Sequence, residues 1–273
     1  YDEVSPREDI QNKNRIICSV ESAHYLRNAY DLVVIDESES ICDNLTGGMI
    51  QKNNPVGNIT AMHSVIKYSS KVVVMDAYLT TRSFDMIRMI TEKKREDCFY
   101  LKNEFQFEPR FATMFNGKGC KQQFNARLKK QLQDGRRCVV VMGGKTHSEA
   151  IEEMLKTEGI SYILHNSNEK NKLPPNADVD TLWSGVQCLI YTPTITAGIS
   201  YTNPNWVFDD LFIYCVNKGS CHIRDTIQAH RRVRNFASKN VYVCVNDLWR
   251  GHESSSMPMV KSECEEYYSH FKQ

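Results

Sequence analysis

The 273-residue sequence has no apolar run that approaches the roughly 18 residues needed to span a membrane. Its opening stretch, YDEVSPREDI, carries too many charges for the apolar core of a secretory signal peptide. The net charge is only +1, which favours neither an acidic nor a basic partner, although a balanced chain can still carry a local basic groove. We therefore expect an intracellular, soluble chain, or a piece of one, with no membrane partner.

Cysteine is present, but the spacings that would give it a structural role are missing. None of the ten cysteines forms a C-x-x-C pair, which argues against a zinc ribbon and against a dense disulfide framework. Several, such as Cys138 and Cys188, lie inside apolar runs, where a free thiol packs as a small hydrophobic group. Cys215, Cys221 and His222 could be drawn as metal ligands, but no fourth ligand has suitable spacing.

The nucleotide-binding loop G-x-x-x-x-G-K-[ST] is also missing from the sequence. Residues 143–146, GGKT, imitate its ending, but the first glycine of the motif would fall on Val139, inside the strand-like run CVVVMG. Valine does not readily adopt the φ > 0 geometry that such a loop uses. We interpret GGKT as a strand-to-helix turn with a helix cap at Thr146 or Ser148, in which Lys145 meets a nucleic-acid phosphate or solvent.

Short apolar runs rich in β-branched residues alternate with amphipathic stretches. The near-continuous apolar character of the runs predicts parallel strands covered on both faces, so the fold class is an open α/β fold. The expected strands are RIICSV (15–20), LVVIDE (32–37), KVVVMDA (71–77), DCFYLKN (97–103), CVVVMG (138–143), SYILHN (161–166), VQCLIYT (186–192), LFIYCV (211–216) and VYVCV (241–245). The expected helices cover 22–29, 58–68, 81–95, 120–134, 146–158 and 222–237.

A change of composition near residues 103–118 predicts two domains, 1–108 and 109–273. The first has only three or four expected strands and none before Arg15. We interpret it as the back part of an α/β domain whose opening strands are missing.

Two acids follow an expected strand in LVVIDESES. In open α/β sheets the carboxyl ends of the strands bind ligands. In nucleotide hydrolases a first carboxylate at this place holds Mg²⁺ and a second orients or deprotonates the attacking water, roles that fit Asp36 and Glu37 in order. The alternative is a pair of solvated acids at the end of a strand.

The run KVVVMDAYLT also ends in an acid, Asp76, and continues to Thr80. Such an acid could couple a nucleotide site to a neighbouring domain. It could equally cap the helix expected from Thr81.

The segment LIYTPTITAGISY is an expected strand followed by a loop rich in threonine and glycine. The hydroxyls of Thr192, Thr194 and Ser200 and the backbone N–H groups around Gly198 suit contacts to phosphates of a nucleotide or a nucleic-acid strand. An ordinary turn is the alternative. Tyr201 could stack on a base or belong to the core.

The segment CHIRDTIQAHRRVRNF places Gln228 and three arginines, Arg231, Arg232 and Arg234, near the end of an expected helix. The arginines cannot all share one helix face, because successive residues are about 100° apart. At least one is therefore available to a phosphoryl group, unless all three form a solvated basic helix end.

Taken in order, these stretches resemble the motor core of superfamily 2 helicases, and most closely the herpesvirus-type replication-origin-binding helicases. The resemblance covers about residues 15–245. SVESAHYL resembles motif Ib, VVIDESES the Walker B box, VVVMDAYLT motif III, VVVMGGKTHSEA motif IV, YTPTITAGISY motif V and QAHRRVR motif VI. It implies two RecA-like parallel-sheet domains in tandem, the first truncated at its N-terminal side.

The resemblance also implies roles for individual residues. They are Mg²⁺ binding at Asp36, a catalytic base at Glu37, interdomain coupling through Asp76 and Thr80, arginine fingers at Arg232 and Arg234, nucleotide contact at Gln228, and strand contacts at Ser19, Ser22, Thr192 and Thr194. Four features depart from the family pattern. Ser38 replaces a cysteine in the acid box, and Arg231 replaces a glycine before the first finger. Arg234 follows Arg232 by two residues where many members have three, and Ser200 replaces an acid that contacts ribose.

The implied function is an ATP- and Mg²⁺-dependent helicase or translocase that binds single-stranded or duplex nucleic acid. The family implies DNA, initiation of replication together with other replication proteins, and the nucleus or cytoplasm of a host cell if the source is viral. The family's phosphate-binding loop precedes the Walker B strand, so we expect it before residue 1 and expect the chain alone to hydrolyse ATP poorly. The alternatives are a nucleic-acid-binding scaffold that has lost turnover and another nucleotide-using α/β enzyme, such as a transferase.

Overall fold

The computed structural model describes residues 13–26, 29–46, 54–77, 79–105, 108–174, 176–195, 199–216, 226 and 228–246. The chain divides into two compact units, Tyr1–Phe105 and Gln106–Gln273. The sequence predicts this division at residue 108.

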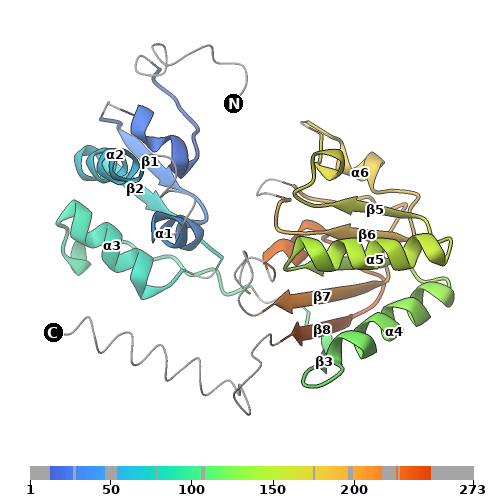
Figure 1. The fold of residues 1–273 in the computed structure, drawn as a ribbon. Coiled ribbons are helices and arrows are strands. Elements are labelled where there is room, and N and C mark those ends of the chain that lie inside the picture. The colour runs from blue at the N-terminus through green and yellow to red at the C-terminus, as the bar shows by residue number, and fades with distance from the viewer. Residues whose placement is uncertain are drawn as a thin grey trace. The chain divides into compact units, whose positions relative to one another are not determined.

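The first unit contains a small parallel sheet flanked by helices (Figure 1). Strand β1 (Leu32–Ile35) pairs with β2 (Lys71–Val74) in parallel, from Leu32 opposite Lys71 to Ile35 opposite Val74. The other elements among the described residues of this unit are a 3₁₀ helix η2 (Val20–Tyr25), helices α1 (Ser38–Thr46), α2 (Pro55–Tyr68) and α3 (Thr81–Thr91), and a 3₁₀ turn η4 (Arg95–Asp97).

The second unit is built on a six-stranded, all-parallel sheet in the order β3-β8-β7-β4-β6-β5. Its strands are β3 (Phe111–Phe115), β4 (Cys138–Met142), β5 (Tyr162–His165), β6 (Cys188–Tyr191), β7 (Asp210–Val216) and β8 (Asn240–Asn246). Its helices are α4 (Cys120–Gln133), α5 (Lys145–Thr157), η5 (Glu169–Asn171), α6 (Val179–Leu182) and η6 (His230–Arg232).

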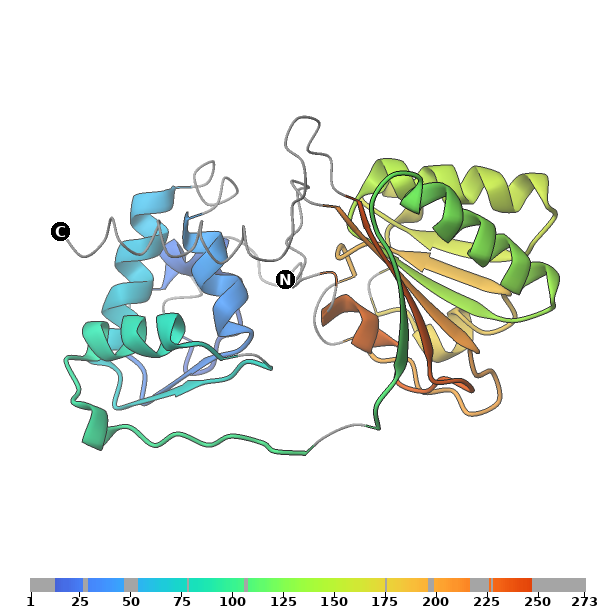
Figure 2. The same ribbon diagram turned by 90° about the horizontal axis from the view of Figure 1, so that it is seen from below.

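Both faces of this sheet are covered, as the continuous apolar strands predict. Helices α4 and α5 lie on one face, and α6 and η6 lie on the other (Figure 2). Along β4, Val140 packs in the core under α4 and α5, and Val139 and Val141 pack in the core that includes Trp183, the residue that follows α6. All five residues of β4 are buried.

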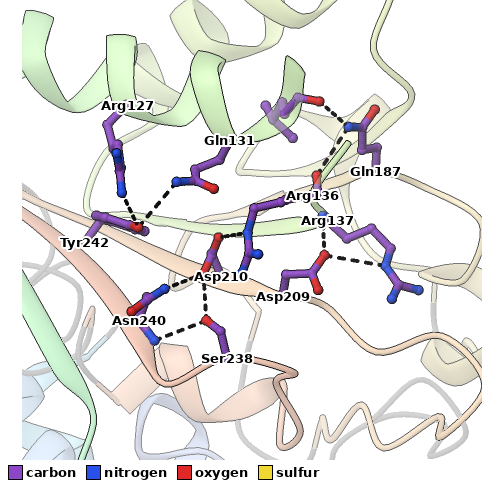
Figure 3. A network of polar contacts seen from close by, with 11 residues as sticks. Arg127, Gln131, Arg136, Arg137, Gln187, Asp209, Asp210, Ser238, Asn240 and Tyr242 are labelled. Atoms are coloured by element: carbon purple, nitrogen blue, oxygen red, sulfur yellow. Dashed lines mark hydrogen bonds and ion pairs between the residues drawn. The ribbon is translucent and has the colours of Figure 1, made fainter. Parts of the chain in front are cut away.

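The amino ends of the central strands are joined by a buried ionic network (Figure 3). Asp210, which is fully buried at the start of β7, accepts two hydrogen bonds from Arg136, of 2.5 and 3.0 Å. It also accepts one from the Ser238 hydroxyl at 2.6 Å and one from the Asn240 amide at 3.4 Å. This network joins the start of β7 to the segments that lead into β4 and β8. It lies at the amino ends of the strands, whereas the helicase-like motifs of this unit follow the carboxyl ends.

Several expectations about secondary structure are wrong. Residues 15–20 form no strand, since Ile17 is 97% exposed and a 3₁₀ helix begins at Val20. Residues 97–103 run without strand pairing, whereas β3, at residues 111–115, was not expected. The helix expected to reach residue 237 ends with η6 at Arg232. In each case the sequence does contain the apolar run or the helical periodicity. Whether the segment forms a strand or a helix depends on the segments that it pairs with or packs against.

The GGKT segment forms a strand-to-helix turn, as predicted. Gly143 donates its N–H to the Tyr214 carbonyl at 2.8 Å, and a Cβ atom there would lie 3.2 Å from that oxygen and 3.3 Å from the Thr226 hydroxyl. Glycine therefore favours this close approach, because a Cβ atom would require the neighbouring atoms to move by a few tenths of an ångström. The expected cap is wrong, because helix α5 begins at Lys145 with Gly144 as its N-cap and no side-chain cap bond.

Candidate nucleotide and nucleic-acid site

The acid pair lies at the carboxyl end of β1, where the sequence predicts it. Asp36 is exposed, and its carboxylate accepts the N–H of Glu37 at 3.0 Å. Glu37 is half-buried and has a φ of +53°, a left-handed conformation that is unusual for a residue with a side chain. Strained backbone of this kind concentrates at functional sites, which makes the pair a candidate catalytic centre.

A third acid, Glu39 in the first turn of α1, organises the surroundings of the pair. It is only 1% exposed, and its Oε1 accepts both the N–H and the hydroxyl of Thr80, each at 2.7 Å. Its Oε2 accepts a hydrogen bond from Arg82 at 2.8 Å, and its own N–H donates to Asp76 Oδ2 at 2.9 Å. The loop after β1 is therefore fixed to the segment that follows β2.

These contacts decide between the two interpretations of Asp76. The N-cap of helix α3 is Thr80, whose hydroxyl accepts the N–H of Arg82, whereas Asp76 accepts the N–H of Glu39. Asp76 is thus not the cap of α3. The coupling of Asp76 and Thr80 to another domain stays a prediction. Glu39 has no predicted role in the sequence analysis, although it is the last residue of the Asp-Glu-x-Glu motif.

The environment of Glu39 predicts a pH-dependent stability. Burial raises its pKa, but hydrogen bonds from Ser83, Thr80 and Arg82 outweigh burial and lower the pKa from its ordinary 4.5 to about 2. Because the folded-state pKa lies below the unfolded value, this contribution is complete above about pH 4.5 and is lost as the pH falls through 2. Its size is about 3 kcal/mol, because each pKa unit is worth about 1.36 kcal/mol.

Urea unfolding followed by circular dichroism at pH 7 and at pH 3 checks this expectation. Glu39→Gln should lower stability at pH 7 and reduce the difference between the two pH values. The exposed Glu96→Gln change should alter neither. An unchanged pH dependence in Glu39→Gln would contradict the assigned contacts.

The expected strand contacts of the first unit lie around η2. Ser19 is exposed just before this 3₁₀ helix, and its carbonyl accepts the N–H of Ser22 at 3.0 Å. The helix is anchored to α2 because both the N–H and the ring nitrogen Nδ1 of His24 bond to Asn58 Oδ1, at 2.9 and 2.7 Å. Nucleic-acid contact by Ser19 and Ser22 stays a prediction.

In the second unit, the segment after β6 places its two threonines differently. Thr192 is 5% exposed, and its N–H donates to the His165 carbonyl at 3.0 Å. Its hydroxyl lies 2.8 Å from that of the exposed Thr194. Thr194 is thus the more accessible candidate strand contact, with Thr192 behind it. Gly198 lies outside the described residues.

The segment of Arg232 and Arg234 is paired with the earlier segment around Tyr201. Tyr201 donates its N–H to the Arg232 carbonyl at 2.7 Å and accepts the N–H of Arg234 at 3.1 Å. The buried Tyr191 donates its hydroxyl to the Ala229 carbonyl at 2.9 Å. Tyr201 is 1% exposed, so it is a core residue and not a platform for bases.

The two arginines have different environments. Arg232 is half-buried, and its Nε is buried with no hydrogen-bond partner in the part of the chain that the structure describes. The same is true of Gln228 Nε2. Arg234 is exposed, and its Nε donates to the Ser200 hydroxyl at 3.1 Å. Buried donors without an acceptor are costly, so Gln228 and Arg232 suit an anionic ligand.

Other candidates are less specific. Lys145 is exposed at the start of α5, with its ammonium 4.0 Å from Glu149. Among the described residues, no group of three or more His, Cys, Asp and Glu side chains could hold a metal ion. Cys215 is a buried free thiol, and Cys221 and His222 lie outside the described residues. No helix in the described ranges is both long and apolar enough to cross a membrane.

A solved structure shares the fold. S. cerevisiae Dbp5 bound to RNA and ADP BeF3 has a TM-score of 0.54 and 13% identity, and the match covers 87% of this chain and 57% of that chain. At this identity the likeness concerns the fold alone. It confirms the predicted class, RecA-like α/β units with parallel sheets.

Two viral proteins show sequence similarity. A protein of African swine fever virus that is named for a helicase/primase complex is 25% identical over 252 residues, which cover 90% of this chain and 23% of that protein. The replication origin-binding protein of human herpesvirus 6B is 24% identical over 264 residues, covering 94% of this chain and 32% of that protein. The chain therefore spans about a quarter to a third of the length of these relatives.

The sequence resemblance to origin-binding helicases is confirmed by a family model that matches residues 5–115 and 113–273. The two matches together extend over both units. The chain belongs to the origin of replication binding protein family.

Proposed function

We propose that this chain is the greater part of the motor of an ATP-dependent DNA helicase that acts when replication begins. Its family and the names of its viral relatives support a replication-associated, helicase-like function. The observation that carries the proposal is the buried Glu39 network. In a motor, nucleotide binding and hydrolysis must change the position of other segments. Glu39 supplies such a connection, because its hydrogen bonds join the loop of the acid pair to the segment after β2.

The residues present fit a magnesium nucleotide. Mg²⁺ is commonly held by one or two protein carboxylates together with phosphate oxygens and waters, so the exposed Asp36 carboxylate is a sufficient protein ligand. The buried donors of Gln228 and Arg232 would find acceptors on phosphate oxygens. ATP would supply the phosphoryl group, and Mg²⁺ would neutralise the charge that develops during its transfer.

In this proposal Glu37 orients the attacking water and accepts its proton. The left-handed backbone at Glu37 and the bond from its N–H to Asp36 fix the two carboxylates in one loop. Arg232 stabilises negative charge on the transferring group. The sequence holds no G-x-x-x-x-G-K-[ST] motif, so the proposal assigns none of these 273 residues to the lysine that normally holds the β- and γ-phosphates.

Glu37→Gln tests the proposal in the longest natural form of the protein. We expect strand-stimulated ATP hydrolysis to fall about a hundredfold, because a positioned general base contributes roughly 10²–10⁴-fold. Binding of single-stranded DNA should be unchanged.

The matched control is Glu104→Gln, because the Glu104 side chain is 81% exposed. It should leave both activities intact. Full hydrolysis in Glu37→Gln would remove the assigned base. A wild-type protein that binds the strand but never hydrolyses ATP would instead support the scaffold alternative.

A further inference from the structure

A cavity of about 370 Å³ lies in the second unit, at the carboxyl ends of β5 and β6. Its apolar lining comes from Leu173, Ile195 and Ile199, together with Pro174. Thr194, the accessible candidate strand contact, also lines it. The volume lies within the range of about 300–1,000 Å³ that is usual for small-molecule sites.

Side-chain hydrogen bonds hold the wall of the cavity beside β5. The buried Asn166 accepts hydrogen bonds from the Asn168 N–H at 3.0 Å and from the Asn171 side chain at 3.2 Å, and it donates to Ser148 at 3.3 Å. Just before it, His165 Nε2 accepts the indole N–H of Trp183 at 3.0 Å. Because the polar atoms of Asn166 are already engaged, this residue shapes the cavity and is not the group that reads a ligand.

The groups left to contact a ligand are neutral. Ser167 and Asn176 line the cavity with exposed side chains, and neither makes a hydrogen bond within the described part of the chain. Among the lining residues that the structure describes there is no acid, and the one charged group, the Lys172 ammonium, is held by Glu169 at 2.5 Å. An apolar floor with a neutral polar rim suits a flat, uncharged heterocycle better than a phosphate.

We propose that this cavity receives one base of the single strand whose backbone passes Thr194. The proposal rests on the nucleic-acid binding proposed above and adds to it a base-binding pocket. The base lies against Leu173, Ile195 and Ile199, and its polar edge meets Asn176 and Ser167. Contacts to the sugar–phosphate backbone bind a strand whether or not it carries bases. With this pocket, the affinity for the strand also depends on the presence of a base at one position.

Two substitutions separate base binding from backbone binding. Leu173→Trp fills the half-buried floor. Asn176→Gly removes the rim amide but keeps the left-handed backbone, since Asn176 has a φ of +58° that glycine adopts freely. Leu182→Trp, at an exposed leucine that does not line the cavity, is the matched control for the added indole.

The full chain is titrated with a fluorescently labelled deoxyribose oligonucleotide carrying all its bases, and with the same backbone carrying abasic sites throughout. We expect wild-type protein and Leu182→Trp to prefer the strand with bases about tenfold, and both pocket variants to lose most of that preference while keeping their affinity for the abasic strand.

Equal weakening of both strands by the pocket variants, or an unchanged preference, overturns the base pocket and leaves the proposed function standing. Failure of wild-type protein to bind either strand overturns both. If Leu173→Trp does not fold, as judged by circular dichroism, Asn176→Gly decides by the same criteria.

Discussion

Replacing Arg232 with alanine should lower strand-stimulated ATP hydrolysis at least about a thousandfold, because an arginine that reaches a transferring phosphoryl group contributes roughly 10³–10⁵ in rate. The structure distinguishes Arg232 from Arg234 by burial and partners. Arg232 has a buried Nε for which the described residues supply no acceptor, and its backbone carbonyl accepts the Tyr201 N–H at 2.7 Å. Arg234 is exposed and already donates its Nε to Ser200.

Arg234→Ala is the matched control in the same segment, and we expect it to cost much less than Arg232→Ala. Arg232→Lys should recover little, because a lysine ammonium lacks the planar, forked donors of a guanidinium. The rates are measured at saturating ATP and strand in the longest natural form of the protein, with thermal unfolding as a check on folding. A reversed order, with Arg234→Ala nearly inactive and Arg232→Ala nearly normal, would assign the finger to Arg234.

Sequence alone predicts most of the central strands, because their character comes from burial on both faces. The run CVVVM is apolar at every position, and all five residues of β4 are buried between two helical layers. The acid pair could be placed on different grounds, because a strand followed by Asp36 and Glu37 puts both at the carboxyl end of that strand.

The contacts that organise the site were less predictable, because they join residues far apart in the chain. Nothing local indicates that Glu39 is buried against Thr80, or that Val233 forms a parallel bridge with Tyr201 where a helix was expected. The bridge also explains why the helix stops at Arg232. Residues 15–20 and 97–103 show the converse, since β-branched or aromatic runs without a pairing partner form no strand.

The buried ionic network of Figure 3 gives the largest expected effect on stability. Asp210→Asn should lower the free energy of unfolding of the second unit by about 3 kcal/mol, because breaking a buried ion pair leaves an uncompensated charge. The new amide would also direct a donor at Arg136. The value lies at the low end of the usual range because the Arg136 side chain is 35% exposed and can recover some hydration.

Tryptophan fluorescence in urea measures this effect selectively, since all three tryptophans, at positions 183, 206 and 249, belong to the second unit. Asp209→Asn is the matched control. Its carboxylate is 21% exposed and accepts the Arg137 N–H at 2.7 Å, so we expect a loss of about 1 kcal/mol. A loss as small for Asp210→Asn would show that the ion pair adds little.

The double variant Arg136→Gln with Asp210→Asn separates the charge from the geometry. Two neutral amides can bond to one another, so the double variant should be more stable than the sum of the single losses predicts. The Ser238 and Asn240 bonds to position 210 remain available to an asparagine oxygen, so the start of β7 should stay joined to β8. Because the network lies at the amino ends of the strands, opposite the proposed ligand edge, these variants should lose stability while folded protein still binds the strand.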